Sequence, residues 1–161
     1  MKEYRATKKH PFHISCGGIV YKDGGGGVKI LLLHRFKSEE WPFDGWHLPK
    51  GTKHFDELDS QTVEREVFEE TGYQVKVLNE IGSLKSNYIL DKNTKANKIT
   101  HYYLCEPIKK IRNQVEEHSE IKWVELNEAI KLVSSFKIWE REEKILKLLY
   151  RERCEAKSPL G

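Results

Sequence analysis

The sequence predicts an α/β chain, in which strands and helices contribute to one core. Two patterns support this class. Short apolar runs of strand length, bounded by turn-forming residues, recur along the chain. Other segments carry apolar residues three and four apart, the spacing of one face of a helix. These patterns by themselves indicate α plus β, without an arrangement of the strands.

The chain is expected to begin with a β-hairpin. Residues 13–21 (HISCGGIVY) and 28–34 (VKILLLH) are apolar runs. The glycine-rich segment 22–27 (KDGGGG) between them is typical of a hairpin turn. Four glycines also suggest a phosphate-binding loop, but no helix and no Gly-Lys-Ser/Thr follows, so a turn is favoured. A loop is expected at 36–45 and a short strand at 46–48.

The second half is expected to hold more strands and then two helices. The expected elements are strands at 74–89, 98–106 and 121–124 and helices at 126–133 and roughly 136–151. The residues Asp91–Thr94 form the turn between the first two of these strands. The last helix carries an apolar stripe at Ile138, Ile145, Leu148 and Leu149.

Length and composition predict one domain, residues 1–151, followed by a polar tail, 152–161. The chain has 161 residues, of which 38% are hydrophobic and 11% aromatic, enough for a core. Its three cysteines, Cys16, Cys105 and Cys154, lie far apart and are odd in number. We therefore expect free thiols in a reducing compartment.

The charge and hydropathy patterns exclude several classes of protein. The net charge is +3, and the charged residues are of both signs, so nothing indicates a nucleic-acid-binding surface. No apolar run approaches the roughly 20 residues that span a bilayer. Because the N-terminus also lacks an apolar signal core, a cytoplasmic protein is expected, with no membrane partner. The sequence does not indicate an oligomeric state.

An acidic segment, 51–73, is the strongest functional signal. Its seven carboxylates belong to Asp56, Glu57, Asp59, Glu64, Glu66, Glu69 and Glu70. The second half of the segment is expected to form a helix, on which Glu66, Glu69 and Glu70 are neighbours and repel one another. Divalent cations would neutralise such a cluster, and oxygen ligands favour Mg²⁺ or Mn²⁺ over zinc.

The ends and the core face of this helix can also be predicted. Gly72 is expected to end it in a left-handed turn. Asp59 or Ser60 is expected to cap its N-terminus. Val63 and Val67 are four residues apart, so they are expected to face the core together.

The spacing of the acidic segment resembles the Nudix box, the signature of hydrolases that cleave a nucleoside diphosphate linked to another group. The box positions are Gly51, Glu57, Arg65-Glu66-Val67, Glu69-Glu70 and Gly72-Tyr73, where Tyr73 replaces a usual small aliphatic residue. The resemblance implies the Nudix fold, a mixed β-sheet sandwiched between α-helices, with the box helix on one side and the C-terminal helix on the other. It also implies a small nucleotide as the substrate.

The resemblance further implies roles for the box residues. The metal ligands are expected to be Glu66, Glu69 and Glu70 with the backbone carbonyl of Lys50. Gly51 lets the backbone approach the metals. Arg65 is implied to hold Glu57 and its loop on the helix, although a surface ion pair of little energy is an alternative.

A loop glutamate can complete the site. Glu117 lies where family members often supply a further carboxylate, which binds metal or deprotonates water. Glu116 and Glu120 are rival candidates, and a surface acidic cluster is the alternative. The general base is expected to be Glu70 or Glu117.

Beyond the box, the chain is similar to asymmetrical diadenosine tetraphosphate hydrolases, a MutT-like group, over nearly its whole length. The supporting residues are Ser15–Gly17, Leu31–Leu33, Trp46–Gly51, Asn87–Tyr88, Lys98, Tyr102–Leu104, Glu117–His118, Trp123 and Phe136–Lys137. The implied reaction converts diadenosine tetraphosphate to ATP and AMP. A nucleoside triphosphate pool-sanitising pyrophosphohydrolase, a diphosphoinositol polyphosphate phosphohydrolase and a non-catalytic nucleotide sensor are alternatives.

Substrate-binding residues are expected around this core. Lys50 would place an ammonium near the phosphates, or else solvate its loop, and Arg35 would bind terminal phosphates unless it lies in a solvated loop. Tyr88 and Tyr102 are candidates to stack on adenine, with Tyr102 favoured. Phe136 would close the pocket, although core burial is its alternative.

Overall fold

A computed structural model describes residues 2–40, 42–113, 119–135 and 141–156. The strands are β1 (Phe12–Asp23), β2 (Val28–Arg35), β3 (Gly45–His47), β4 (Lys50–Thr52), β5 (Tyr73–Asp91), β6 (Thr94–Lys110) and β7 (Ser119–Glu125). The helices are α1 (Asp59–Thr71), α2 (Leu126–Ser134) and α3 (Glu143–Ala156). All of the predicted strands and helices are present, with shifted bounds.

Strand β1 is the centre of the sheet because it changes partner along its length. Its first half pairs antiparallel with β4, with Cys16 opposite Gly51, and its end pairs antiparallel with β2, with Tyr21 opposite Ile30. Its other edge pairs in parallel with β6. The sheet is therefore mixed, and β4 ends beside the start of β1, where the acidic segment begins.

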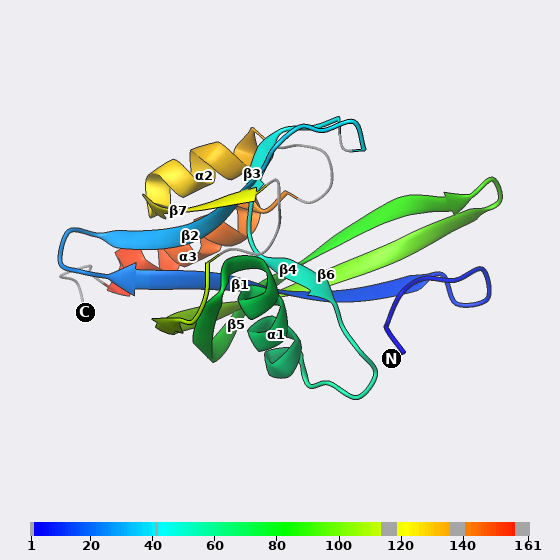
Figure 1. Cartoon of the computed structure of the whole chain (residues 1–161), viewed down its shortest axis with the longest axis horizontal. Helices are drawn as coiled ribbons and strands as arrows, with labels where there is room; N and C mark the ends of the chain where they lie inside the picture. The colour runs from blue at the N-terminus through cyan, green and yellow to red at the C-terminus, as the bar shows by residue number, and fades with distance from the viewer. Residues whose placement is uncertain (1, 41, 114–118, 136–140, 157–161) are drawn as a thin grey trace.

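Helices cover both faces of the sheet, as Figure 1 shows. Helix α1 packs its Val63 and Val67 on one face, where they form a buried cluster with Val20 of β1. Helices α2 and α3 cover the other face, and Ile145 and Leu149 of α3 belong to a second buried cluster. This arrangement confirms the predicted sandwich, with α1 and the C-terminal helix on opposite sides.

The prediction was correct for the C-terminal end of α1 and wrong for its N-terminal end. Gly72 ends the helix at a φ of 78°, and its N–H donates to the Phe68 carbonyl oxygen over 2.9 Å, which confirms the left-handed turn. The N-terminal cap is Leu58, so the prediction of Asp59 or Ser60 is wrong. Asp59 is the first helical residue, and its carboxylate accepts hydrogen bonds from Lys53 (2.6 Å) and the Tyr103 hydroxyl (2.8 Å).

The C-terminal helix also needs correction. It begins at Glu143, whereas the expected start, Phe136, lies outside the described residues, as does Ile138. Leu148 is 42% exposed and does not belong to the buried stripe. Its place is taken by Leu146, because residues 145, 146 and 149 share the helix face that meets the sheet.

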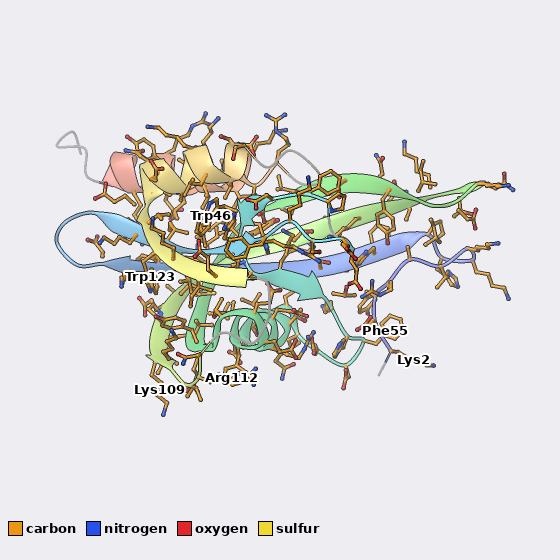
Figure 2. The ribbon with its side chains drawn as sticks, turned by 45° about the horizontal axis from the view of Figure 1, so that its top comes forward. Lys2, Trp46, Phe55, Lys109, Arg112 and Trp123 are labelled. Atoms are coloured by element: carbon orange, nitrogen blue, oxygen red, sulfur yellow. The ribbon has the colours of Figure 1, made fainter. Side chains whose placement is uncertain are left out.

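The N-terminal segment (residues 2–6) was not predicted to have a role, yet it pairs with the loop after β4. The Tyr4 N–H donates to the Lys53 carbonyl (2.8 Å), and the Phe55 N–H donates to the Lys2 carbonyl (2.9 Å). Figure 2 shows Lys2 and Phe55 close together at this end of the molecule. The Ile14 N–H of β1 in turn donates to the Tyr4 carbonyl. The segment therefore connects the start of the acidic segment to β1.

Two of the cysteines, Cys16 and Cys105, are free and buried, while the side chain of Cys154 lies outside the described residues. Burial raises the pKa of both described thiols to about 12, so they stay protonated. None of the described helices is long and apolar enough to cross a membrane.

Candidate active site

Helix α1 and strand β4 meet through a glutamate and a glycine. The carboxylate of Glu66 lies so close to Gly51 that a β-carbon on residue 51 would come within 2.0 Å of Glu66 Cδ and 2.2 Å of both carboxylate oxygens. A glycine is therefore required at position 51 for Glu66 to keep this position. The carboxylate of Glu66, on α1, thus reaches the backbone of β4 at this point.

Arg65 connects the helix to the loop that precedes it. Its Nε and Nη2 donate to the two oxygens of Glu57 over 2.6 and 3.1 Å, and Nη2 also donates to the Thr52 carbonyl at 3.0 Å. Its Nη1 donates to Glu66 Oε1 at 2.6 Å. The bidentate pair joins the loop, the end of β4 and the helix, as the Nudix-box resemblance implies for Arg65 and Glu57.

The two glutamates bonded to Arg65 differ in their pKa. Burial raises the pKa of Glu57, but the hydrogen bonds from Arg65 and Thr62 outweigh it and hold the pKa at about 2. The pKa of Glu66 is raised, mainly by burial and further by the charges of Glu69 and Glu57, against the lowering effect of Arg65. Glu57 is thus a stable anion, whereas the charge on Glu66 is costly.

The other two box glutamates occupy different surroundings. Glu70 accepts a long hydrogen bond (3.4 Å) from the Lys50 N–H, so it too lies against β4. The side chain of Glu69 is 52% exposed, and it lies 3.5 Å from Nη1 of Arg65. Glu66 and Glu70 therefore flank the Lys50–Gly51 backbone, and Glu69 lies toward solvent.

The donors around Gly51 fit a hard divalent cation in their chemistry. They are carboxylate and carbonyl oxygens, and a cation here would offset the cost of the buried charge on Glu66. No group of three His, Cys, Asp or Glu side chains in the described part of the chain is already arranged to hold a metal. Arg65 holds Glu66 instead, so a cation would compete with that guanidinium for the carboxylate.

A groove of about 210 Å³ lies next to these carboxylates. It is lined by His13, Ser15, Arg35, His47, Lys50, Gly51, Thr52, Glu70 and Lys98. Desolvation lowers the pKa of His47 to about 3, so that ring is neutral at pH 7. The charged side chains that line the groove are therefore three cations, Arg35, Lys50 and Lys98, and the carboxylate of Glu70.

Lys50 lies in this groove but is paired with a residue that the sequence analysis missed. Its ammonium is 3.2 Å from Glu142 Oε2, just before α3, and the two side chains are 13% and 4% exposed. A signal was present in the sequence, since Glu142 precedes Ile145, Leu146 and Leu149 at helical spacing. An acidic residue on the same helix face as a row of buried apolar residues suggests a buried carboxylate that is paired with a cation.

The two candidate tyrosines have different exposures. Tyr88 is half-buried, and its hydroxyl lies 2.9 Å from Nδ1 of His13 in the groove wall. Tyr102 is fully buried in the core, and its hydroxyl donates to Glu142 at 2.6 Å. The preference for Tyr102 as the stacking residue is therefore wrong, because a ring with no exposed face cannot stack on a base.

The histidine at the groove wall was also missed. His13 is buried, and its Nε2 lies 3.0 Å from Thr52 Oγ1 and 3.3 Å from Ser15 Oγ. These contacts tie β1 to the end of β4. Two predicted residues, Glu117 and Phe136, lie outside the described residues, as does the rival Glu116, whereas Glu120 lies 3.4 Å from Nδ1 of His34.

Comparisons with known sequences agree with this geometry. Residues 11–149 match the NUDIX domain. A MutT-like protein of Streptomyces ambofaciens is 27% identical over 125 residues, which are 77% of this chain and 71% of the relative. A CMP-5'-(N-acetyl-N-hydroxy-3-aminopropyl)phosphonate hydrolase of Streptomyces rubellomurinus is 29% identical over 80% of this chain, which spans only 61% of that relative's length.

Solved structures share the fold. The Ap4A hydrolase of C. elegans, in a binary complex, has a TM-score of 0.65 at 21% identity, over 89% of this chain and 98% of its own. The MutT protein of Methanosarcina mazei Go1 has a TM-score of 0.64 at 25% identity, over 89% and 96% of the two chains. At these identities the likeness to the Ap4A hydrolase shows the fold alone.

Proposed function

This chain belongs to the Nudix hydrolase family, and from that premise we propose that it hydrolyses a pyrophosphate bond in a nucleoside polyphosphate with the help of Mg²⁺ or Mn²⁺. The observation that carries the proposal is the meeting of carboxylates and cations at the Lys50–Gly51 backbone. The carboxylates of Glu66 and Glu70 lie against this backbone. The groove that contains Arg35 and Lys98 lies next to it.

The carboxylates of Glu66, Glu69 and Glu70 and the Lys50 carbonyl would hold the metal. A bound divalent cation would neutralise phosphate charge and acidify a water molecule. Arg65 would move its Nη1 from Glu66 to the solvent side while its bidentate bond to Glu57 keeps the loop in place. Glu70, or Glu117 from outside the described residues, would accept the proton of the attacking water.

The cations of the groove would bind the phosphates that follow the cleaved bond. Arg35 and Lys98 stand on different strands, β2 and β6, so together they would grip a phosphate chain from two sides. Tyr88 of β5 lies beside this groove through its contact with His13 and would stack on a base. A long polyphosphate suits this combination better than a single phosphate.

Among such substrates we favour diadenosine tetraphosphate, giving ATP and AMP. The residues shared with asymmetrical diadenosine tetraphosphate hydrolases support it, and the fold shared with the Ap4A hydrolase of C. elegans is consistent with it. We further propose that the chain acts as one domain that extends beyond the expected end at residue 151, because α3 continues to Ala156.

A panel assay tests the substrate class. Diadenosine tetraphosphate, nucleoside triphosphates, ADP-ribose and a diphosphoinositol polyphosphate would be incubated with enzyme and Mg²⁺, and the products separated by chromatography. We expect ATP and AMP from diadenosine tetraphosphate at the highest kcat/KM. Preference for another substrate by more than about tenfold, or about 1.4 kcal/mol in transition-state binding, would overturn the choice.

A second candidate substrate comes from one relative. The Streptomyces rubellomurinus relative is named as a hydrolase of a CMP conjugate of a phosphonate, so a nucleoside monophosphate joined to a second group is worth adding to the panel. Release of CMP from such a conjugate, with slow turnover of diadenosine tetraphosphate, would favour this candidate. Binding of nucleotides without any turnover would favour a sensor.

A further inference from the structure

A buried carboxylate from the C-terminal part of the chain contacts Lys50, a residue that lines the active-site groove. Glu142 lies directly before α3, and its backbone carbonyl accepts the N–H groups of Ile145 and Leu146 in the first turn. Its side chain is 4% exposed. Since a buried charge is costly unless it is paired and hydrogen-bonded, its partners should reveal why it is there.

The partners of Glu142 come from two places, the segment Leu48–Lys50 beside the groove and the core residue Tyr102. Oε1 accepts the Leu48 N–H at 3.0 Å, and Oε2 accepts the Lys50 ammonium at 3.2 Å and the Tyr102 hydroxyl at 2.6 Å. The carboxylate therefore accepts three donors, of which Leu48 lies in the turn between β3 and β4 and Lys50 is the first residue of β4. The Lys50 N–H in turn bonds Glu70, one of the proposed metal ligands.

The contacts give Glu142 two effects on the groove. It holds the backbone N–H of Leu48 and the side-chain ammonium of Lys50, the residue next to Gly51. It also balances the positive charge of the Lys50 ammonium, which is 13% exposed and lies beside the proposed site for cations. Without this carboxylate, the ammonium would repel a divalent ion more strongly.

We propose that Glu142 is a positioning residue of this active site, which neutralises and orients Lys50 so that the Lys50–Gly51 backbone and its neighbouring glutamates can hold a divalent cation. The proposal rests on the proposed function, since it concerns the same site. It adds a residue that lies far from the box in the sequence and that no pattern of the box includes.

The test replaces Glu142 with an isosteric neutral side chain. Glu142→Gln keeps one acceptor for Leu48 but presents an amide donor to the Lys50 ammonium. Mn²⁺ affinity would be measured by calorimetry, and kcat and KM with the best substrate of the panel. We expect Mn²⁺ affinity to fall at least fivefold and kcat at least tenfold, with KM changing less than threefold.

The matched control is Glu143→Gln. Glu143 is the next residue and is equally buried, but its ion-pair partner is the exposed Arg141. We expect this variant to bind Mn²⁺ within twofold of the wild-type protein, even if its thermal midpoint drops. Equal loss of Mn²⁺ affinity in both variants would overturn the proposal, because burial at the start of α3 would then explain the effect.

A second change tests neutralisation itself. In the Glu142→Gln background, Lys50→Met removes the ammonium that faces the new amide. We expect at least half of the loss of Mn²⁺ affinity, on a logarithmic scale, to be recovered, while KM for the polyphosphate rises above that of Glu142→Gln. A simple loss of packing would not be repaired in this way, and no recovery would overturn the proposal.

A milder variant covers the case in which Glu142→Gln does not fold. Tyr102→Phe removes one donor to Glu142 and keeps the buried ring, and we expect a two- to fivefold loss of Mn²⁺ affinity. Unchanged affinity in this variant, or in a folded Glu142→Gln, would overturn the inference alone. Wild-type protein that fails to bind Mn²⁺ would overturn the proposed function as well.

Discussion

The carboxyl carbon of Glu66 lies where a β-carbon on Gly51 would come within 2.0 Å of it. A strand glycine and a helix glutamate, fifteen positions apart in the sequence, thus share one small space. Because the proposed metal site lies at this contact, the requirement for glycine can be tested directly.

Gly51→Ala should abolish most metal binding and turnover. The added methyl group displaces the Glu66 carboxylate, so we expect at least a 10- to 100-fold loss of kcat/KM, the usual cost of disturbing even outer partners of a metal. Gly26→Ala is the control, since a β-carbon there meets no atom within 4 Å. Activity of Gly51→Ala within threefold of the control would contradict the assignment.

Glu69→Gln should remove most turnover without unfolding the protein. Glu69 is half exposed, and its ion pair with Arg65 is long at 3.5 Å, so its loss costs little stability. We expect kcat to fall at least about tenfold. Glu64→Gln, an exposed position on the same helix, serves as the control, and a far-ultraviolet spectrum with a thermal melt checks the fold. Near-normal turnover would remove Glu69 from the metal site.

The Glu57–Arg65 pair should make stability depend on acid pH. The pKa of Glu57 is about 2 in the folded protein, below its ordinary value of 4.5, so the folded state binds fewer protons. The stabilisation is therefore complete above pH 4.5 and is lost as pH falls toward 2, by up to about 3 kcal/mol.

Urea unfolding at pH 6, 4 and 3 measures this dependence. The free energy of unfolding of Glu57→Gln should lie below that of the wild type at pH 6, and the gap should narrow to about half or less at pH 3. Asp56→Asn, an exposed neighbour, should change neither value by more than about 0.5 kcal/mol. A gap that stays constant with pH would show that the charge of Glu57 is not responsible.

The N-terminal segment should stabilise the loop of the acidic segment through an aromatic pair. The rings of Tyr4 and Phe55 meet edge to face with centroids 4.3 Å apart. A double-mutant cycle of Tyr4→Ala and Phe55→Ala should give a coupling energy of about 1 kcal/mol. As a control, the effects of Tyr4→Ala and Phe43→Ala, which lies on another loop, should be additive. Equal coupling energies in the two cycles would refute a specific contact between Tyr4 and Phe55.

Tyr88 should contribute to nucleotide binding, and Tyr102 should not contribute a stacking face. Tyr88→Ala is expected to raise KM for diadenosine tetraphosphate by a factor corresponding to roughly 1–3 kcal/mol, whereas Tyr88→Phe should keep most of the affinity. Tyr150→Ala, an exposed tyrosine on α3, is the control. If Tyr88→Ala leaves KM unchanged, the base binds elsewhere.

Local patterns predicted much of this molecule well. The spacing of Val63 and Val67 predicted the buried face of α1, and Gly72 predicted its end, because helix periodicity and left-handed turns are properties of neighbouring residues. The resemblance to the Nudix box was sufficient to indicate the family, since its residues are close together in the sequence. Even there the cap was wrong, because Lys53 and Tyr103 engage the Asp59 side chain.

The sequence by itself determined the elements, the buried face of the acidic helix and the family. Only the tertiary structure decided which groups meet across the groove, since Glu142 and Lys50 are 92 positions apart. It also decided that Tyr102 lies in the core and that Tyr88 contacts His13, which lines the groove. The reason is that alternation along a strand determines only toward which face of the sheet a side chain points. Whether that side chain is buried depends on the helices and loops that pack on that face.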